Sequence, residues 1–571
     1  MARERLIMVA QGREKADVVL KNAKVFHTYL GEFETADIAV ADGRVAAIGT
    51  GYAGKEEIDL AGKYVIPGLI NAHLHIESSM LAPSEFARAV LPLGTTTVIA
   101  DPHEIANVAG VDGIKYMLEA VKDIPLNVYF TLPSCVPSTN LEHSGAVLSA
   151  DDLRQFVDDD KVLGLAEMMN VPGVLNADAE IMKKIHLMGK KRVDGHAPAL
   201  LGNEVMAYAS AGINSDHECN TPEEAKQRLK AGMYILIREG SAAKNMKAIL
   251  PIINKYSSQF CCICTDDRHP ADLLEEGDIN YTVRLAVKHG ISVATAIQMA
   301  TINAARYFGL NDIGAIAPGF LADLVVLDNI ADFRPELVYK SGKLVAKNGK
   351  MLVDVACIAD SKMEDSVHLA KVTLDDFKIE AKGDKANVIE LIPYQLVTKR
   401  KFLPVKKVRG EAAADPERDI LKLAVFERHH ATGQHGLGFI KGFGLKKGAI
   451  GSTVGHDSHN LIVVGANDED MLLAVKTLEK AKGGMVIVAD GEVAGLLPLE
   501  IAGLMSKLTV EETAERVEKM RSIAYDLGVN KEYDPFITLA FMSLPVIPDL
   551  KLTDMGLVDV NEFRIIGLEE E

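Results

Sequence analysis

The central part of the chain alternates short apolar, β-branched runs with longer stretches of helical periodicity. This alternating pattern is typical of βα units that build a parallel sheet. Eight apolar runs follow one another within about 250 residues, the usual size of a (β/α)₈ barrel. The predicted strands are residues 64–76, 95–103, 127–136, 161–170, 192–198, 212–218, 234–241 and 260–267.

The two flanks of this central part have a strand-rich pattern of their own. Residues 17–26 and 37–49 alternate partly between apolar and polar positions, and Asp42-Gly43 is a hairpin signal. A similar pattern returns at residues 319–328 and 335–346. We infer one small β domain, built from both flanks of the central insert.

The region after residue 365 has a mixed α/β pattern. Residues 468–482 and 510–527 have helical amphipathicity, and residues 484–493 begin a hairpin that turns at Asp490-Gly491. The expected fold is therefore α/β with three parts. These are a composite β domain (1–65 and 318–362), a (β/α)₈ TIM-like barrel (66–317) and a C-terminal α/β domain (363–571).

Composition and charge narrow the classes of function. Of the 571 residues, 48% are hydrophobic and 25% are charged, which is an ordinary globular balance. The formal net charge of −18 disfavours contact with phosphate backbones and anionic lipid, so we expect neither nucleic acid nor a membrane as a partner. Six cysteines and a charged N-terminus without a signal-like apolar core indicate the cytoplasm.

Potential metal ligands gather at the predicted carboxyl ends of the barrel strands. Because these ends form the active-site face of such barrels, the side chains are expected to meet at one mouth. His73 and His75 are two positions apart on a strand and therefore project to the same face. The candidate donors are His73, His75, Glu167, His196, His217 and Asp266. Each alone is compatible with a packed or capping residue, but six donors on five strand ends indicate a metal site.

Other polar residues at the same strand ends have open roles. His103 and Glu104 end the second predicted strand, Glu218 follows His217, and Arg238 ends the seventh strand. Each can support a ligand, contact a substrate or be structural.

Two further groups of potential ligands lack the spacing of a metal site. Cys261, Cys262 and Cys264 are expected to be small apolar residues of a buried strand. The C-terminal region contains a set of histidines that lie either in a loop over the barrel mouth or on the surface. They are His429, His430, His435, His456 and His459.

Five short motifs are the most specific feature of the chain. They are Asn71-Ala-His-Leu-His-Ile-Glu-Ser-Ser79, Ala100-Asp-Pro-His-Glu-Ile-Ala-Asn107, Gly164-Leu-Ala-Glu-Met-Met-Asn170, Cys264-Thr-Asp-Asp-Arg-His269 and Gly451-Ser-Thr-Val-Gly-His-Asp-Ser-His-Asn460. Together with Pro67-Gly68 and the stretch 317–325, they resemble the amidohydrolase superfamily and, within it, the prokaryotic adenine deaminase family.

This resemblance implies a centre with two divalent metal ions. His73, His75 and Asp266 would hold one ion, His196 and His217 the other, and Glu167 would bridge them. Many relatives bridge with a carboxylated lysine, but this strand offers Lys161 only at its start. The nitrogen and oxygen ligands suit Mn, Fe or Zn, and the sequence does not choose among them.

The implied reaction is hydrolytic deamination of adenine to hypoxanthine and ammonia. Metal coordination lowers the pKa of bound water to about 7, so that a metal-bound hydroxide attacks C6. Asp266 is the candidate proton acceptor, with Glu218 as a second catalytic candidate. Asp267, His103 and Arg238 are candidate substrate contacts. Asp267 occupies the position that binds purine N7 in adenosine deaminases, with a helix cap or an ion pair with Arg268 as alternatives.

Other functional classes compete with a purine deaminase. A cyclic-amide or amide hydrolase of the same superfamily, such as a hydantoinase or amino-sugar deacetylase, uses the same hydroxide. A single-zinc deaminase needs Pro-Cys-x-x-Cys, which the chain lacks although His75-Ile-Glu77 matches the other element. A barrel that has lost activity should also have lost ligands, whereas all six positions are filled. We expect the enzyme to be a homo-oligomer, namely a dimer.

Overall fold

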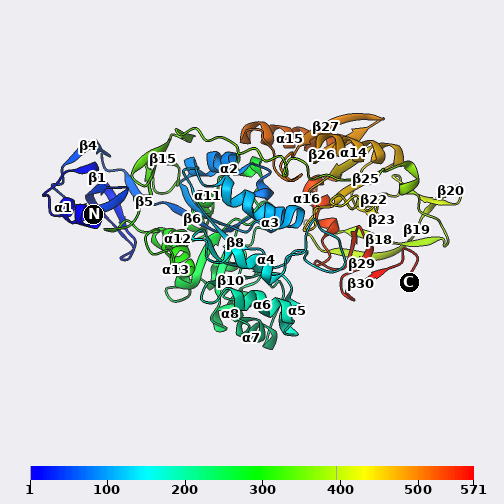
Figure 1. Cartoon of the computed structure of the whole chain (residues 1–571), viewed down its shortest axis with the longest axis horizontal. Coiled ribbons are helices and arrows are strands. Elements are labelled where there is room, and N and C mark those ends of the chain that lie inside the picture. Colours follow the sequence, from blue (N-terminus) through cyan, green and yellow to red (C-terminus); the bar gives the residue numbers. More distant parts are fainter. Residues whose placement is uncertain (1, 394, 571) are drawn as a thin grey trace.

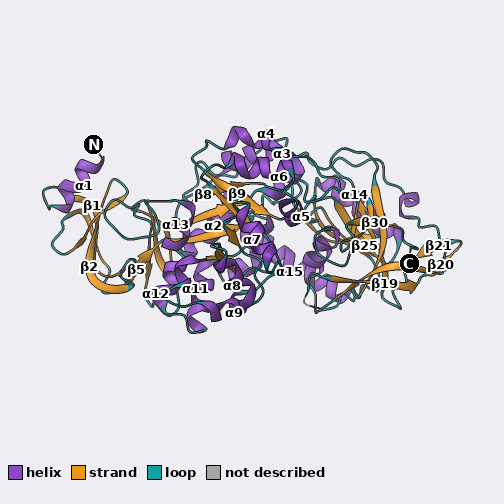
Figure 2. Ribbon diagram, turned by 90° about the horizontal axis from the view of Figure 1, so that it is seen from below, coloured by secondary structure: helices purple, strands orange, loops and turns teal. Residues whose placement is uncertain are grey.

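The computed structural model describes residues 2–393 and 395–570. Three parts follow one another along its long axis, and the two chain ends lie at opposite ends of the molecule (Figure 1). The view from below shows the central strands surrounded by helices (Figure 2). Among the described residues, no helix combines the length and apolar character needed to cross a bilayer.

The first part is a nine-stranded sheet that takes strands from both sides of the barrel segment. Its path is β17-β16-β15-β14-β5-β1-β2-β3, and β4 pairs with β1. The strands are β1 (Ala16–His27), β2 (Glu32–Ala41), β3 (Arg44–Gly49), β4 (Gly54–Asp59), β5 (Tyr64–Pro67), β14 (Leu324–Leu327), β15 (Pro335–Lys340), β16 (Lys343–Lys347) and β17 (Lys350–Met351), with α1 (Ala2–Ala10) before them. The antiparallel pair of β5 and β14 joins the two flanks, with Val325 opposite Ile66.

The central part is a barrel of eight strands in the predicted chain order. They are β6 (Leu69–Leu74), β7 (Thr95–Ala100), β8 (Asn127–Leu132), β9 (Val162–Met168), β10 (Arg192–Gly195), β11 (Ser215–Asp216), β12 (Tyr234–Arg238) and β13 (Cys261–Cys264). They form parallel sheets of five and three strands. The Asn214 amide donates to the Val193 carbonyl at 2.8 Å on one side, and the Asp266 amide donates to the His73 carbonyl at 3.1 Å on the other. These contacts close the barrel.

Helices connect and surround these strands. They are α2 (Pro83–Val90), α3 (His103–Ala120), α4 (Ala150–Leu153), α5 (Val171–Leu175), α6 (Ala179–Leu187), α7 (Asn203–Ser210), α8 (Pro222–Lys230), α9 (Met246–Ile249), α10 (Pro270–Glu275), α11 (Ile279–Lys288), α12 (Val293–Met299) and α13 (Ile302–Phe308).

The last barrel strand, β13, contains three fully buried cysteines, Cys261, Cys262 and Cys264. Their burial confirms the expected packing role.

The predicted first strand, residues 64–76, is wrong as a single element. It divides into β5, which belongs to the first sheet, and β6, which belongs to the barrel. Gly68 separates them where the backbone passes so close to Thr96 that a Cβ would lie 2.0 Å from its Oγ1. The other predicted strands extend too far at their carboxyl ends, because the chain leaves the sheet there. Asp266, for example, has a left-handed φ of 60°.

The C-terminal part is a sheet covered by helices on both faces. Its path is β19-β18-β23-β22-β25-β24-β26-β27. The elements are β18 (Lys385–Leu391), β19 (Thr398–Pro404), β20 (Lys406–Val408), β21 (Glu411–Ala413), β22 (Ile420–Phe426), β23 (His435–Lys441), β24 (Ala449–Ser452), β25 (Leu461–Gly465), α14 (Asp468–Ala481), β26 (Gly484–Ala489), β27 (Glu492–Pro498), α15 (Val510–Asp526), α16 (Pro535–Ala540), β28 (Leu550–Thr553), β29 (Gly556–Asp559) and β30 (Arg564–Ile566). One face packs on α14, and the other packs on α15 and α16.

The predicted C-terminal helices and hairpin agree with α14, α15 and β26–β27 to within a residue or two. Asn467 caps α14, and Thr509 with Glu512 forms a capping box on α15. Asp490 and Gly491 both have positive φ, as a tight hairpin turn requires. The limits of the three domains at residues 66, 318 and 363 stay a prediction.

The C-terminal part is attached to the barrel through several polar contacts. The Ala82 amide donates to the Ser506 carbonyl at 3.3 Å. In the loop after β8, the His143 ring lies 2.6 Å from Asp554, and the His143 carbonyl accepts a hydrogen bond from Asn460 at 2.7 Å. These contacts place the segment around residue 456 over the barrel mouth.

Candidate metal centre and adjoining cavity

The carboxylate of Glu167, at the end of β9, lies between two groups of histidines. Its Oε2 is 2.6 Å from Nδ1 of His196 and 3.1 Å from Nε2 of His217. Its Oε1 faces the other way and is 3.4 Å from Nε2 of His75. Glu167, His75 and His217 are buried, and His196 is partly buried. One carboxylate therefore contacts donors from three other strand ends.

Asp266 and His73 complete the second group of donors. Oδ1 of Asp266 lies 3.1 Å from Nε2 of His75 and 3.6 Å from Nε2 of His73. The left-handed turn at Asp266 ends β13 and brings its carboxylate to the end of β6. All six candidate donors of the sequence thus meet at one mouth.

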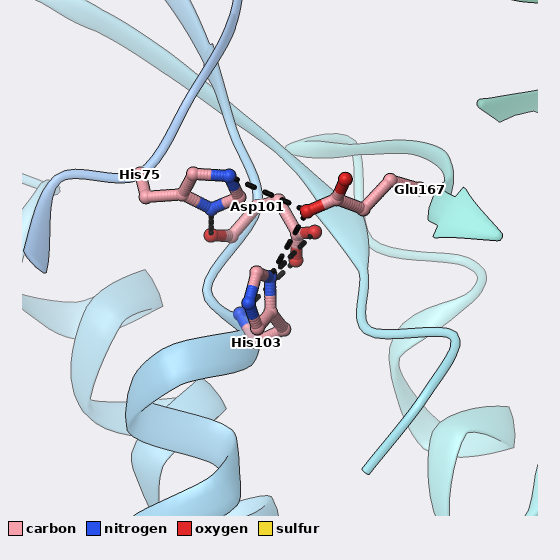
Figure 3. A group of neighbouring side chains, drawn as sticks. All are labelled: His75, Asp101, His103 and Glu167. Carbon is pink, nitrogen blue, oxygen red and sulfur yellow. Dashed lines mark hydrogen bonds and ion pairs between the residues drawn. The ribbon is translucent and has the colours of Figure 1, made fainter. Parts of the chain in front are cut away.

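Asp101 and His103 extend this group from the end of β7 and the start of α3. Figure 3 shows both with His75, their side chains turned toward Glu167. Nδ1 of His103 is 3.0 Å from Asp101 and 3.6 Å from Glu167. The Asp101 carbonyl accepts a hydrogen bond of 3.1 Å from Nδ1 of His75, which leaves Nε2 of that ring with the lone pair that a metal needs. His103 therefore lies beside the candidate metal ligands.

Asp101 is the residue of this group that the sequence analysis missed. It directly follows the last apolar residue of β7, so the rule that selected the other strand-end donors also applies to it. His103, two positions later, was the more conspicuous ligand type.

Arg238 joins Glu218 to Asp266. Its Nη1 donates to Asp266 at 2.7 Å and also to Oε1 of Glu218, and its Nη2 donates to Oε2 of Glu218 at 3.0 Å. Glu218 in turn lies 3.7 Å from both His196 and His217. Both guanidinium ends of Arg238, expected to contact the substrate, are thus occupied by carboxylates.

Asp267 lines a cavity beside this centre. Its carboxylate accepts a hydrogen bond of 2.5 Å from Ser78 Oγ. The N-cap position of α10 is His269, and Arg268 pairs with Glu276 at 2.8 Å. Both structural alternatives for Asp267 are therefore absent among the described residues, and its side chain stays available at the cavity.

The electrostatics of the centre favour positive charge. Although burial disfavours charged imidazoles, the surrounding carboxylates raise the pKa of His75 well above its usual value and that of His196 to about 9. Burial also opposes ionisation of Glu167 and Asp266, yet their neighbours hold both pKa values well below the ordinary range. Burial and nearby carboxylates raise the pKa of Glu104, close to this group, to about 8.

These residues fit divalent cations. Nε2 of His73 is buried without a hydrogen-bond partner among the described residues, as expected for a ring nitrogen that faces a cation site. Subsets of the histidines and carboxylates lie close enough together to share an ion, for example His73 with His75 and Asp266, or His73 with Glu167 and His217. All donors are nitrogen or oxygen, which suits first-row divalent metals.

Comparison with known proteins shows the family to which the chain belongs. Residues 64–351 match the amidohydrolase family, and residues 395–564 match the adenine deaminase C-terminal domain. The chain is 54% identical to adenine deaminase 2 of Carboxydothermus hydrogenoformans, over 98% of each chain. It is 48% identical to adenine deaminase of Clostridium acetobutylicum, over 99% of each chain. L-hydantoinase from Arthrobacter aurescens matches with 16% identity and a TM-score of 0.45, over 59% of this chain and 98% of that chain.

Proposed function

Because the chain belongs to the amidohydrolase family and, within it, to the adenine deaminases, we propose that it hydrolyses adenine to hypoxanthine and ammonia. The observation that carries the proposal is the carboxylate of Glu167 between two histidine groups, beside a cavity at the barrel mouth. In the reaction, water adds at C6 and the exocyclic amine leaves as ammonia.

The proposed centre binds two divalent ions, for which Mn, Fe and Zn are all suitable. His73, His75 and Asp266 are proposed to hold one, His196 and His217 the other, with Glu167 as the bridge. Such ions lower the pKa of a bound water to about 7 and so supply a nucleophile at neutral pH. The unpartnered nitrogen of His73 and the two-sided contacts of Glu167 support this assignment.

Asp266 is proposed to accept the proton of the nucleophile and to deliver it toward the leaving amine. Its Oδ1 faces the histidines, while Arg238 binds its Oδ2 and keeps the carboxylate ionised. Glu218, also held by Arg238, is the second catalytic candidate. Asp267 is proposed to bind the purine at N7, and His103 to contact the substrate from the side of α3.

Ammonia release from a purine panel tests this proposal. We expect adenine to release ammonia and to yield hypoxanthine, with metal analysis giving two divalent ions per chain. Hydantoins and N-acetylated amino sugars are run in parallel, because a cyclic-amide or amide hydrolase would open or deacylate these instead. Turnover of either amide substrate with none of adenine would overturn the assignment.

The compartment, oligomeric state and partners of the enzyme are proposed as well. We propose a cytoplasmic homodimer that acts on a free purine base, with neither nucleic acid nor a membrane as a partner. The net charge of −18 supports the exclusion of polyanionic partners. Light scattering on the purified protein measures the oligomeric state, and a monomer would contradict that part of the proposal.

A further inference from the structure

The cavity beside the candidate metal centre has walls from two parts of the chain. Glu77, Ser78 and Asp267 of the barrel line one side, whereas His456 and Phe541 of the C-terminal part line another. A molecule bound there would contact both parts of the protein.

This cavity adjoins the candidate ligands on both sides. On the barrel side, Asp267 follows Asp266 directly, and Glu77 comes two residues after His75. On the C-terminal side, Asp457, the neighbour of His456, lies 3.9 Å from Nε2 of His103. The C-terminal segment therefore approaches the same group of side chains that the barrel strands bring together.

The C-terminal wall is an aromatic pair held by backbone contacts. The rings of His456 and Phe541 are stacked, with centroids 4.5 Å apart and an interplanar angle of 29°. The His456 amide donates to the Ala540 carbonyl at 3.0 Å, and Ser543 Oγ donates to the His456 carbonyl at 3.2 Å. Flat heterocycles stack on such surfaces, because the ring faces are apolar and polarisable.

The barrel wall is polar and includes an unsatisfied group. Glu77 is 2% exposed, and its Oε2 has no hydrogen-bond partner among the described residues. Buried polar oxygens normally have a partner, and Glu77 is one of the residues that line the cavity. Ser78 and Asp267 lie beside it. A purine edge carries both N–H donors and ring-nitrogen acceptors, which these groups can meet.

Glu104, His456 and His459 lie close enough together to suggest a further cation site. The hydrogen bonding of His459 opposes this reading. The Gly455 amide donates to Nδ1 of His459 at 3.3 Å, so the neutral ring carries its proton on Nε2. Neither ring nitrogen then has a free lone pair for a metal, and the group lacks one of its three ligands.

We propose that the C-terminal domain completes the purine site, with the His456 ring, held by Phe541, stacking on the base. Ser78, Glu77 and Asp267 meet the polar edge of the same base from the barrel. This inference rests on the proposed function and deepens it, because it assigns base recognition to a domain outside the barrel.

The test compares variants of the metal-loaded, full-length enzyme. For His456→Ala and Phe541→Ala we expect the KM for adenine to rise about tenfold or more, as loss of base stacking does, with a smaller change in kcat. His456→Phe keeps a stacking face and should retain most of the affinity. His435→Ala and Phe563→Ala replace the same residue types elsewhere in the C-terminal part and should leave KM unchanged.

Three measurements accompany the kinetics: metal content, thermal unfolding, and calorimetric titration with adenine and hypoxanthine. Unchanged KM and Kd in both alanine variants would overturn the inference. Loss of metal from folded His456→Ala would also overturn it, since the ring would then be a ligand. If the wild type bound purines but released no ammonia, the proposed function would fail, while the binding data would still decide whether His456 contacts the base.

Discussion

Two groups of histidines in this chain lie in opposite electrostatic environments. At the barrel mouth, His75 is buried and His196 is largely shielded from water, yet carboxylates raise their pKa, to about 9 for His196. In the C-terminal part, burial and neighbouring cations lower the pKa of His429 and His459 well below the usual value. Burial is common to both groups, so the counter-charge decides which state each imidazole prefers.

The partners of each group explain the difference. The barrel histidines face Glu167 and Asp266, whose negative charge stabilises any positive charge among them, a proton or a metal ion alike. The C-terminal histidines bond to the backbone: His429 Nε2 lies 2.8 Å from the Ser458 carbonyl, and His459 accepts from the Gly455 amide. The first group is arranged to bind a cation, whereas the second is arranged to stay neutral and hold a loop.

The largest effect is expected from Glu167→Gln, which removes the negative charge that lies between the histidines at the barrel mouth. A neutral amide bridges two cations poorly, so we expect loss of bound metal and a fall in kcat of roughly 10⁴-fold, as for other essential groups. Metal content per chain and ammonia release measure this. Glu224→Gln, a buried glutamate on α8, is the matched control and should retain both. Full metal content in the Glu167 variant would remove this residue from the centre.

Arg238→Met tests the counter-charge on the other side of the barrel group. It leaves Glu218 and Asp266 buried without their cation, which we expect to lower the free energy of unfolding of the metal-free protein by about 3–5 kcal/mol. Arg238→Lys keeps the charge but not the fork that binds both carboxylates, so its loss should be smaller. Chemical denaturation measures both. Equal stability of Arg238→Met and the wild type would contradict the proposed coupling.

The C-terminal group should make the fold sensitive to acid. His429 and His459 are neutral when folded, but in the unfolded chain each binds a proton below about pH 6.5. The unfolded state then binds more protons, so the free energy of unfolding falls as the pH falls below 6.5, by at most roughly 1.4 kcal/mol per pH unit for each histidine. His429→Gln should reduce this slope in denaturation series from pH 7 to 5. His435→Gln, a partly exposed control, should not.

The smallest effect is expected for a surface contact between the two regions. Arg88 on α2 lies 3.2 Å from Glu511 on α15, and Glu511 is largely exposed. Because exposed ion pairs contribute little, a double-mutant cycle with Arg88→Ala and Glu511→Ala should give a coupling below about 1 kcal/mol. A larger coupling would show that this surface ion pair contributes substantially to holding the two parts together.

Much of the fold was predictable because its signals are local. Strand periodicity and polar strand ends predicted the barrel, and the same two features selected His73, His75, Glu167, His196, His217 and Asp266. The division at Gly68 was not predicted, because one apolar run supplies strands to two different sheets. Asp101 directly follows the last apolar residue of β7, so the rule for strand ends applies to it as well, although it was not selected.

The sequence by itself determined the order of the strands, the composite sheet, and the six candidate donors that meet at the barrel mouth. Only the tertiary structure decided that Arg238 binds two carboxylates, that Asp267 faces a cavity, and that His456 approaches that cavity from a different domain. The physical reason is the range of the interactions. Periodicity reports on neighbours within one element, whereas a contact between His103 and Asp457 depends on how two separately folded surfaces meet.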